Sequence, residues 1–259
     1  MWQKDGTLPP LDSQTNLALA DALGDTPETV IAGHLLRRGL GDGYLAGKLP
    51  HLATAVVRNL AFDTDELMAF GTDAAALWAL LRALDGWSCV SVVPAIAQAL
   101  GALISASGAG SVRFLDDLYH VAARPVPAVP HEAVRLLAPA DGQALERASP
   151  ELPAMGFGSA SSLLRDGIAA AAIVDGRIVA LAQTSARSPH YADLSVAVLP
   201  GYRNRGLATA TAALVVGQLQ AVGQIPLWSA GEHNVASLRV AAKLGFEQVA
   251  QRTYVILDA

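Results

Sequence analysis

Three prolines stand close together near the middle of the chain, at positions 125, 127 and 130. Proline has no amide donor and pushes the preceding residue toward extended geometry, so this stretch is unsuited to a helix or a central strand. We therefore interpret residues 125–130 as a stiff linker. A chain of 259 residues is long enough for a domain on each side. The predicted division is 1–124, a linker over 125–130, and 131–259.

The segment before the prolines is rich in helical patterns. In four stretches apolar residues recur at helical spacing, and Gly24 and Gly39 follow two of them as helix ends. Thr72 is the expected cap of the fourth helix. Alternation over 88–93 and 112–122 then predicts two strands, with a helix over 94–104 between them. We expect a helix-rich α/β domain, with helices over 15–23, 27–38, 44–60 and 73–84.

After the prolines, strand and helix patterns alternate. Asp175-Gly176 supplies the positive φ values of a tight turn, which predicts a hairpin over 168–184. A further strand reaches residue 198, and a long helix follows from residue 207. These patterns predict an α/β (α+β) domain with a mixed sheet flanked by helices. The other expected elements are strands over 134–137, 226–230 and 247–257 and helices from 141, over 159–165 and over 234–244.

Composition excludes several classes of function. The chain is 52% hydrophobic with a formal net charge of -5, so it can bury a large core but lacks the basic patch that nucleic acid requires. No run of about 20 apolar residues predicts a membrane span, and no secretory signal is visible. Cys89 is the single cysteine, which excludes internal disulfides and a thiolate metal cluster. We expect a cytoplasmic protein without metal, nucleic-acid or membrane partners.

The segment Arg203-Asn204-Arg205-Gly206-Leu207-Ala208-Thr209 joins a predicted strand to a predicted helix. Amides of the turn and the first helical residues have no intrahelical acceptors, and with the helix dipole they form an anion site suited to a pyrophosphate. The arginines add positive charge there. The pattern alone also fits an ordinary glycine-containing loop with surface arginines. A nucleotide P-loop is excluded because the G-K-[ST] ending is missing.

This segment resembles motif A of the GNAT (general control non-repressible-related) N-acetyltransferase superfamily, which has a [QR]-x-x-G-x-[GA] loop. A second signature, Asn234-x-x-Ser237 followed by Lys243-Leu244-Gly245-Phe246, is similar to the ending of the same family. The resemblance spans residues 132–254. It implies an acetyl-CoA-dependent N-acetyltransferase that moves an acetyl group to a primary amine, on a small molecule or a peptide, by direct attack.

The resemblance also implies roles for individual residues. The main chain of Val196 and Val198 would pair with the pantetheine arm, and Asn234 and Ser237 would lie beside it. The pyrophosphate would be held by the amides of Arg203, Asn204, Arg205, Gly206, Leu207, Ala208 and Thr209.

For catalysis we favour Asp193 as the base, at the start of the strand that leads into the loop, with the Val198 amide as donor to the thioester oxygen. Rival bases are His190, Glu232 and His233. Many relatives have a tyrosine, acting as acid, where this chain has Ala241. Tyr191 and Tyr254 are substitutes, and the acid remains unassigned.

Two other functions stay open. Ala241 and the unsettled base are compatible with a non-catalytic acyl-CoA-binding or regulatory protein, and an accidental resemblance would leave an unrelated α/β phosphate-ligand binder. The strand, helix and strand over 88–122 could be the remnant of a second, degenerate GNAT-like half. We expect the N-terminal domain to wall the acceptor cleft or to mediate homodimerisation.

Overall fold

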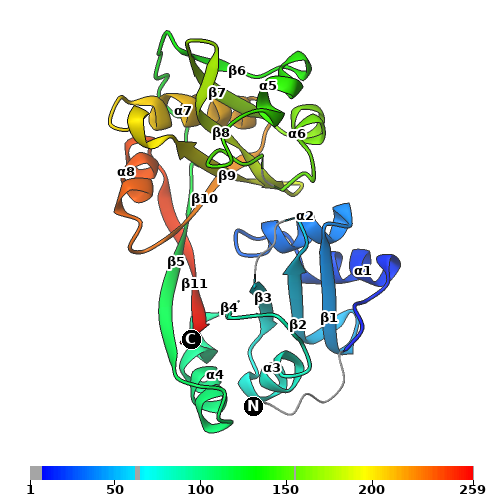
Figure 1. Cartoon of the computed structure of the whole chain (residues 1–259). Coiled ribbons are helices and arrows are strands. Elements are labelled where there is room, and N and C mark those ends of the chain that lie inside the picture. Colours follow the sequence, from blue (N-terminus) through cyan, green and yellow to red (C-terminus); the bar gives the residue numbers. More distant parts are fainter. Residues whose placement is uncertain (1–7, 62–64, 155, 259) are drawn as a thin grey trace. The chain divides into compact units, whose positions relative to one another are not determined.

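The structure is a computed structural model that describes residues 8–61, 65–154 and 156–258. The chain folds into two compact units. The first contains the chain up to Leu118 together with the residues from Ala250 onward, and the second contains Tyr119–Val249 (Figure 1). The chain passes between the units twice, within β5 and within β11. The domain limits inferred from the prolines stay a prediction.

The first unit is a mixed sheet with strand order β1-β2-β3-β4-β11-β5. Strands β1 to β3 are antiparallel neighbours, β3 and β4 are parallel, and β11 pairs antiparallel with β4. The elements are α1 (Ser13–Leu23), α2 (Val30–Arg38), β1 (Gly41–Lys48), β2 (His51–Asn59), β3 (Glu66–Gly71), α3 (Ala74–Leu81), β4 (Cys89–Val92), α4 (Pro94–Ala106), β5 (Val112–Val121) and β11 (Glu247–Leu257).

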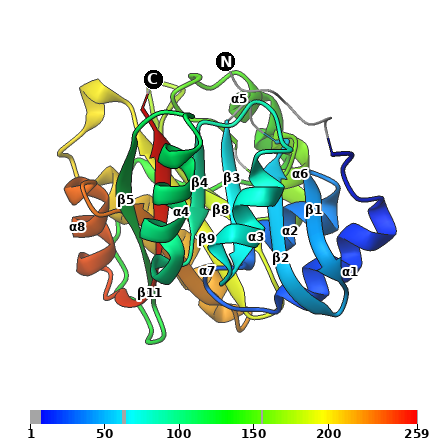
Figure 2. The ribbon, with the colours of Figure 1, turned by 90° about the horizontal axis from the view of Figure 1, so that it is seen from below.

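Helices cover both faces of this sheet because its strands present apolar side chains alternately to each side. Ala55 and Val57 of β2 pack with α1 and α2, whereas Val56 between them packs with α3 and α4. Figure 2 shows α3 and α4 lying over the strands of this unit. None of the described helices combines the length and the apolar character that a membrane crossing needs.

One secondary-structure prediction is wrong in this unit. Residues 44–60 form no helix but the last five residues of β1 and all of β2, an antiparallel hairpin. Gly47 and Pro50 disfavour a helix interior, and Val56 and Val57 are β-branched residues that favour a strand. The cap of α3 also differs by one residue, because Asp73 rather than Thr72 accepts from the first helical amides.

The second unit is a mixed sheet with strand order β10-β9-β8-β7-β6. Its central pairs are antiparallel, and only β9 and β10 are parallel. The predicted hairpin is confirmed, with Asp175 and Gly176 at φ values of 50° and 73° between β7 and β8. The elements are β6 (Val134–Leu136), α5 (Gly142–Glu146), α6 (Ala160–Asp166), β7 (Ala169–Val174), β8 (Arg177–Arg187), β9 (Tyr191–Val198), α7 (Leu207–Ala221), β10 (Ile225–Gly231) and α8 (Val235–Lys243).

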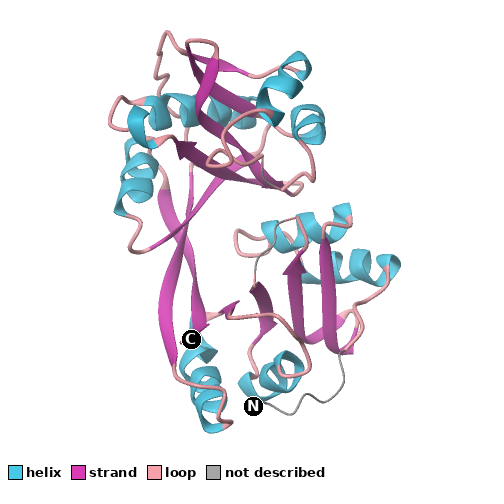
Figure 3. Cartoon of the chain, viewed as in Figure 1, coloured by secondary structure: helices cyan, strands magenta, loops and turns pink. Residues whose placement is uncertain are grey.

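This sheet also carries helices on both faces, as Figure 3 shows. Ala169 and Ala171 of β7 pack with α5 and α6, and Ala170 between them packs with α7. The predicted mixed sheet flanked by helices is therefore confirmed.

The two units repeat the same order of elements. In each unit the order is two helices, three antiparallel strands, a helix, a strand parallel to the third strand, another helix and a final strand. The final strands are exchanged: residues 253–256 of β11 pair with β4 of the first unit, and the Ala122 amide, just after β5, donates to the Pro226 carbonyl of β10 at 3.1 Å. This order supports a second half of the same kind before the prolines.

Candidate active site

The two parallel strands of the second unit separate along their length. Strand β9 pairs with β10 only from Tyr191 to Asp193, opposite Ile225 to Leu227. Both strands continue beyond this point, β9 to Val198 and β10 to Gly231. On its other edge β9 stays paired with β8 as far as Val198. One edge of β9 is therefore left without strand pairing in the described part of the chain after Asp193.

Backbone alternation identifies the groups on this open edge. The Leu199 amide donates to the Val179 carbonyl at 3.0 Å, toward β8. Successive residues of a strand direct their amides to opposite edges, so the amides of Val198 and Val196 are directed to the edge that β10 has left. These are the two residues for which the family resemblance implied pairing with an extended ligand.

The loop after β9 presents a series of backbone amides at the start of α7. Asn204 and Gly206 have positive φ values of 61° and 79°, which turn the chain sharply into the helix. No side chain caps this helix, and within the described residues no acceptor is recorded for the amides from Asn204 to Thr209. A helix N-terminus with free amides attracts anions. The predicted loop residues therefore lie together.

The loop's own contacts hold its arginines. Arg203 Nε donates to the Val198 carbonyl at 3.3 Å, and a terminal nitrogen of Arg205 donates to the Gly201 carbonyl at 3.2 Å. The Arg205 guanidinium also lies over the Tyr202 ring, 5.2 Å from its centroid. Both arginines remain exposed, so two cations flank the free amides.

Asp193 lies where β9 and β10 part, and it is only 4% exposed. Two hydroxyl groups donate to its carboxylate: Ser185 to Oδ2, and Ser229 to Oδ1 at 3.3 Å. Ser185 belongs to a β-bulge between Thr184 and Ala186 of β8, which re-aims its side chain. Neither serine was expected from the sequence. No residue pattern predicts the bulge that carries Ser185, and Ser229 comes from a different strand.

The rival bases are more exposed than Asp193. His190 lies before β9, while Glu232 and His233 lie between β10 and α8, and all three are exposed. Asp193 is thus the one among these four residues that is buried beside the strand separation.

Asn234 and Ser237 lie at the start of α8. Asn234 is the cap of the helix, and its side-chain oxygen accepts from the Ser237 amide at 3.2 Å. The Ser237 hydroxyl accepts from Trp228 Nε1 at 2.8 Å. These bonds give both residues a structural role at the helix start; a role beside pantetheine stays a prediction.

The tyrosines expected to replace the missing acid lie in different units. Ala241 is 1% exposed and packs with Trp228 and Phe246, so its position faces the core of the second unit. Tyr254 belongs to the first unit, where its hydroxyl donates to Glu66 at 2.7 Å. Tyr191 is half-buried at the start of β9.

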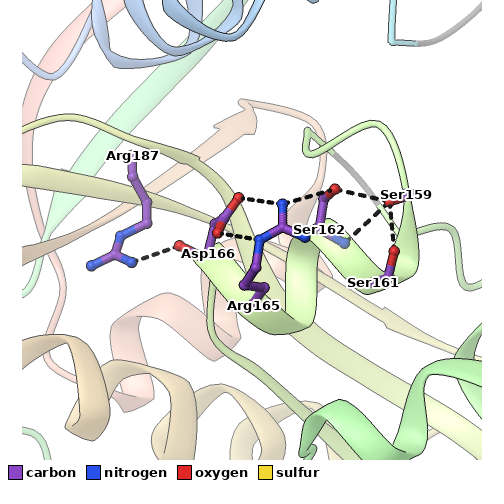
Figure 4. Close-up of polar contacts among 6 residues, drawn as sticks. All are labelled: Ser159, Ser161, Ser162, Arg165, Asp166 and Arg187. Atoms are coloured by element: carbon purple, nitrogen blue, oxygen red, sulfur yellow. Dashed lines mark hydrogen bonds and ion pairs between the residues drawn. The ribbon is translucent and has the colours of Figure 1, made fainter.

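A polar network attaches α6 to the end of β8 (Figure 4). Arg165 forms two bonds with Asp166, at 2.9 and 3.1 Å, and Arg187 donates to the Asp166 carbonyl at 2.8 Å. At the other end of α6, the Ser159 hydroxyl accepts from the Ser162 amide at 3.1 Å. The face of the sheet that carries Asp193 is therefore bordered by a helix held at both ends.

Comparison with known families identifies this half of the chain. The sequence model of the GNAT acetyltransferase family matches residues 142–257. The C-terminal half of the chain belongs to the GNAT acetyltransferase family. Enzymes of this family use acetyl-CoA, so the assignment indicates an acetyltransferase. No curated protein matches the chain in sequence.

Solved structures share the fold over nearly the whole chain. A Drosophila protein is 15% identical, with 98% of this chain and 99% of that chain covered and a TM-score of 0.69. A GCN5-related N-acetyltransferase-like protein from Streptococcus suis is 22% identical, covering 95% and 100%, with a TM-score of 0.67. A tandem GNAT protein from the clavulanic acid biosynthesis pathway is 17% identical, covering 95% and 96%, with a TM-score of 0.57. At these identities the likeness is one of fold.

Proposed function

We propose that this GNAT protein transfers an acetyl group from acetyl-CoA to a primary amine by direct attack on the thioester. The observation that carries the proposal is the separation of β9 from β10 immediately before a loop of free amides. An extended arm can lie along the open edge of β9 while its anionic end reaches the start of α7.

The residues at the start of α7 fit a pyrophosphate. A Cβ built at Gly206 would meet no atom within 4 Å, so the backbone there is open to a ligand. The positive φ of Gly206 is a conformation that side chains disfavour. Arg203 and Arg205, both exposed, add positive charge to the same loop. We infer that the amides from Arg203 to Thr209 hold the pyrophosphate and that Val196 and Val198 pair with pantetheine.

The chemistry follows from the groups around the strand separation. Acetyl-CoA supplies an activated acetyl thioester. In this proposal Asp193 takes the proton from the attacking amine, directly or through water, and Ser185 and Ser229 fix the orientation of its carboxylate. The Val198 amide, directed to the open edge, donates to the oxygen on which negative charge develops. As the bond between the amine nitrogen and the acetyl carbon forms, the C–S bond breaks, and coenzyme A leaves as a thiolate that takes a proton from solvent.

A non-catalytic acyl-CoA-binding protein is the second candidate, and the burial of Ala241 favours it. Alanine has no hydroxyl group, and Ala241 is buried. The position that many relatives use for the acid therefore supplies no proton to the leaving thiolate here. Asp193→Asn separates the two candidates because it keeps the size of the side chain. Acetyl transfer by the natural protein that falls at least 100-fold in the variant, with acetyl-CoA still bound, would rule out the non-catalytic role.

The test of the cofactor site is calorimetric binding of acetyl-CoA to the natural protein and to Gly206→Glu. The variant places bulk and negative charge among the free amides. Gly223→Glu is the matched control, since Gly223 follows the other end of α7 with φ 78° and equally open space for a Cβ. Both variants therefore carry the same backbone strain and the same charge.

We expect the natural protein and Gly223→Glu to bind acetyl-CoA with similar affinity, and Gly206→Glu to lose at least 100-fold. An equal loss in both variants, or tight binding by Gly206→Glu, would contradict the site. Failure of the folded natural protein to bind acetyl-CoA would end the proposal. Preference for a nucleotide over coenzyme A would instead support an unrelated phosphate-ligand binder.

A further inference from the structure

One long polar side chain interrupts the apolar middle of β8. Gln183 is 1% exposed, and its Nε2 donates to the Pro153 carbonyl at 2.7 Å. Its Oε1 is buried and has no hydrogen-bond partner in the part of the chain that the structure describes. A buried carbonyl oxygen without a donor costs free energy, so an orphan of this kind calls for a functional explanation.

The strand register places Gln183 on the same face as the candidate base. Gln183 lies directly opposite Ser195 of β9. Asp193 lies two positions before Ser195 in the same strand and therefore on the same face. Opposed residues have Cβ atoms about 4.5–5.5 Å apart, and diagonal neighbours about 7–8 Å. Leu181, two positions before Gln183, packs with α5 and α6, which identifies the face as the one those helices cover.

The connection between α5 and α6 fixes the direction of the Gln183 amide. A Cβ at Gly156 would lie 1.6 Å from the Ser185 carbonyl oxygen, so this connection rests directly on the β8 bulge. The same connection accepts a hydrogen bond from Gln183 Nε2 through the Pro153 carbonyl, at its middle. The amide nitrogen therefore donates to the loop, and the oxygen of the same planar amide group is directed away from that hydrogen bond.

Two hydrogen-bond acceptors on this face, Gln183 Oε1 and the Asp193 carboxylate, match a ligand that donates. Gln183 Oε1 can only accept, and the Asp193 carboxylate is acceptor-only when ionised. We propose that Gln183 determines acceptor specificity, its amide oxygen accepting a hydrogen bond from an N–H group of the acceptor amine. This inference rests on the proposed function and adds to it that the acceptor is recognised through its N–H groups beside Asp193.

The test compares steady-state kinetics of Gln183→Met with those of Gln220→Met. Methionine keeps the approximate volume and removes the amide. Gln220 of α7 is a matched control because its amide also anchors backbone, donating to the carbonyls of Ala122 and Arg124 at 3.0 and 2.6 Å. The acceptor is the member of a panel of amino acids, polyamines and aralkylamines that the natural protein acetylates fastest.

We expect Gln183→Met to raise the KM for the amine at least fivefold and to leave the KM for acetyl-CoA within twofold, with both constants within twofold in Gln220→Met. A smaller rise for Gln183→Met, or the same rise in the control, would show that Gln183 only anchors the loop. If the natural protein binds acetyl-CoA and acetylates no amine, the proposed function itself fails and this inference falls with it.

If Gln183→Met does not fold, a second measurement on the natural protein tests the inference. The natural protein is labelled with ¹⁵N-glutamine and titrated with the amine that it acetylates fastest. The null probe is the N,N,N-trimethyl analogue of that amine, because a quaternary ammonium group has no N–H to donate. We expect the side-chain amide signals of Gln183 to shift with the amine and those of Gln220 to stay. Unshifted Gln183 signals at saturating amine would overturn the inference.

Discussion

Replacing Arg252 by methionine should destabilise the first unit by about 3–5 kcal/mol. The Arg252 side chain is 2% exposed, and it donates to Ser91 Oγ at 2.7 Å, to the Ser91 carbonyl at 2.8 Å and to the Ala69 carbonyl at 2.6 Å. Its guanidinium also lies 4.8 Å from the centroid of the Phe70 ring. A single side chain of β11 thus contacts both β3 and β4.

The magnitude follows from these contacts. Three hydrogen bonds contribute about 1 kcal/mol each, and a desolvated cation–π contact adds about 1–2 kcal/mol. Contacts of one side chain are coupled and do not simply add, which sets a range of about 3–5 kcal/mol. Arg252→Lys keeps the charge but not the planar fork, so its effect should fall between those of the natural protein and Arg252→Met.

Hydrogen exchange of the β3 and β4 amides under native conditions measures this effect in the first unit alone. We expect exchange about 10²- to 10⁴-fold faster in Arg252→Met. This factor is the destabilisation of about 3–5 kcal/mol converted at about 1.4 kcal/mol for each tenfold change in rate. Arg113→Met is the control, because Arg113 is exposed and only 3.8 Å from Asp258 in an ion pair worth less than about 1 kcal/mol. An Arg252→Met effect no larger than that of the control would refute the reasoning.

Two further predictions concern other parts of the first unit. Burial, together with the nearby carboxylates of Glu66 and Asp65, raises the pKa of Cys89 to about 12. Iodoacetamide should therefore react with Cys89 on the order of 10³-fold more slowly than with a free thiol at pH 8, and about tenfold faster per pH unit from there to pH 10; a rate within tenfold of the free thiol would contradict this. The first unit should have no acetyl-CoA site of its own. Only two residues separate β3 from α3, and Asp73 already accepts from the Ala75 and Ala76 amides at 2.9 and 3.0 Å. Calorimetry should therefore find one acetyl-CoA per chain and not two.

Much of the second unit could be predicted from the sequence because its signals are local. The Asp175-Gly176 turn requires positive φ values that few other pairs adopt, and the strand, loop and helix around Gly206 carry their own stop and start residues. The helix prediction over 44–60 failed because alanine and leucine at helical spacing also fit a buried hairpin. Periodicity does not distinguish the two, and Gly47 and Pro50 were the residues that argued against a helix.

The surroundings of Asp193 could not be predicted, since they depend on contacts between distant segments. Ser185 reaches Asp193 only because β8 carries a bulge, and Ser229 comes from another strand. Gln183 did leave a signal, as a long polar residue within the apolar run of β8, but its partner Pro153 lies 30 positions away. Only the last part of the repeated order of elements, over 88–122, was visible in the sequence, because the two halves share an arrangement without an evident sequence repeat.

The exchange of final strands has a consequence for how the protein is made. Strand β4 of the first unit pairs with residues 253–256, and Arg252 and Ser91 are separated by 161 positions. During translation at about 5–20 residues per second, the first half has to wait about 10–30 seconds for its neighbouring strand while the whole second half is synthesised. An emerging chain therefore exposes one edge of β4 to solvent, a place where chaperones bind or where chains on adjacent ribosomes pair with one another.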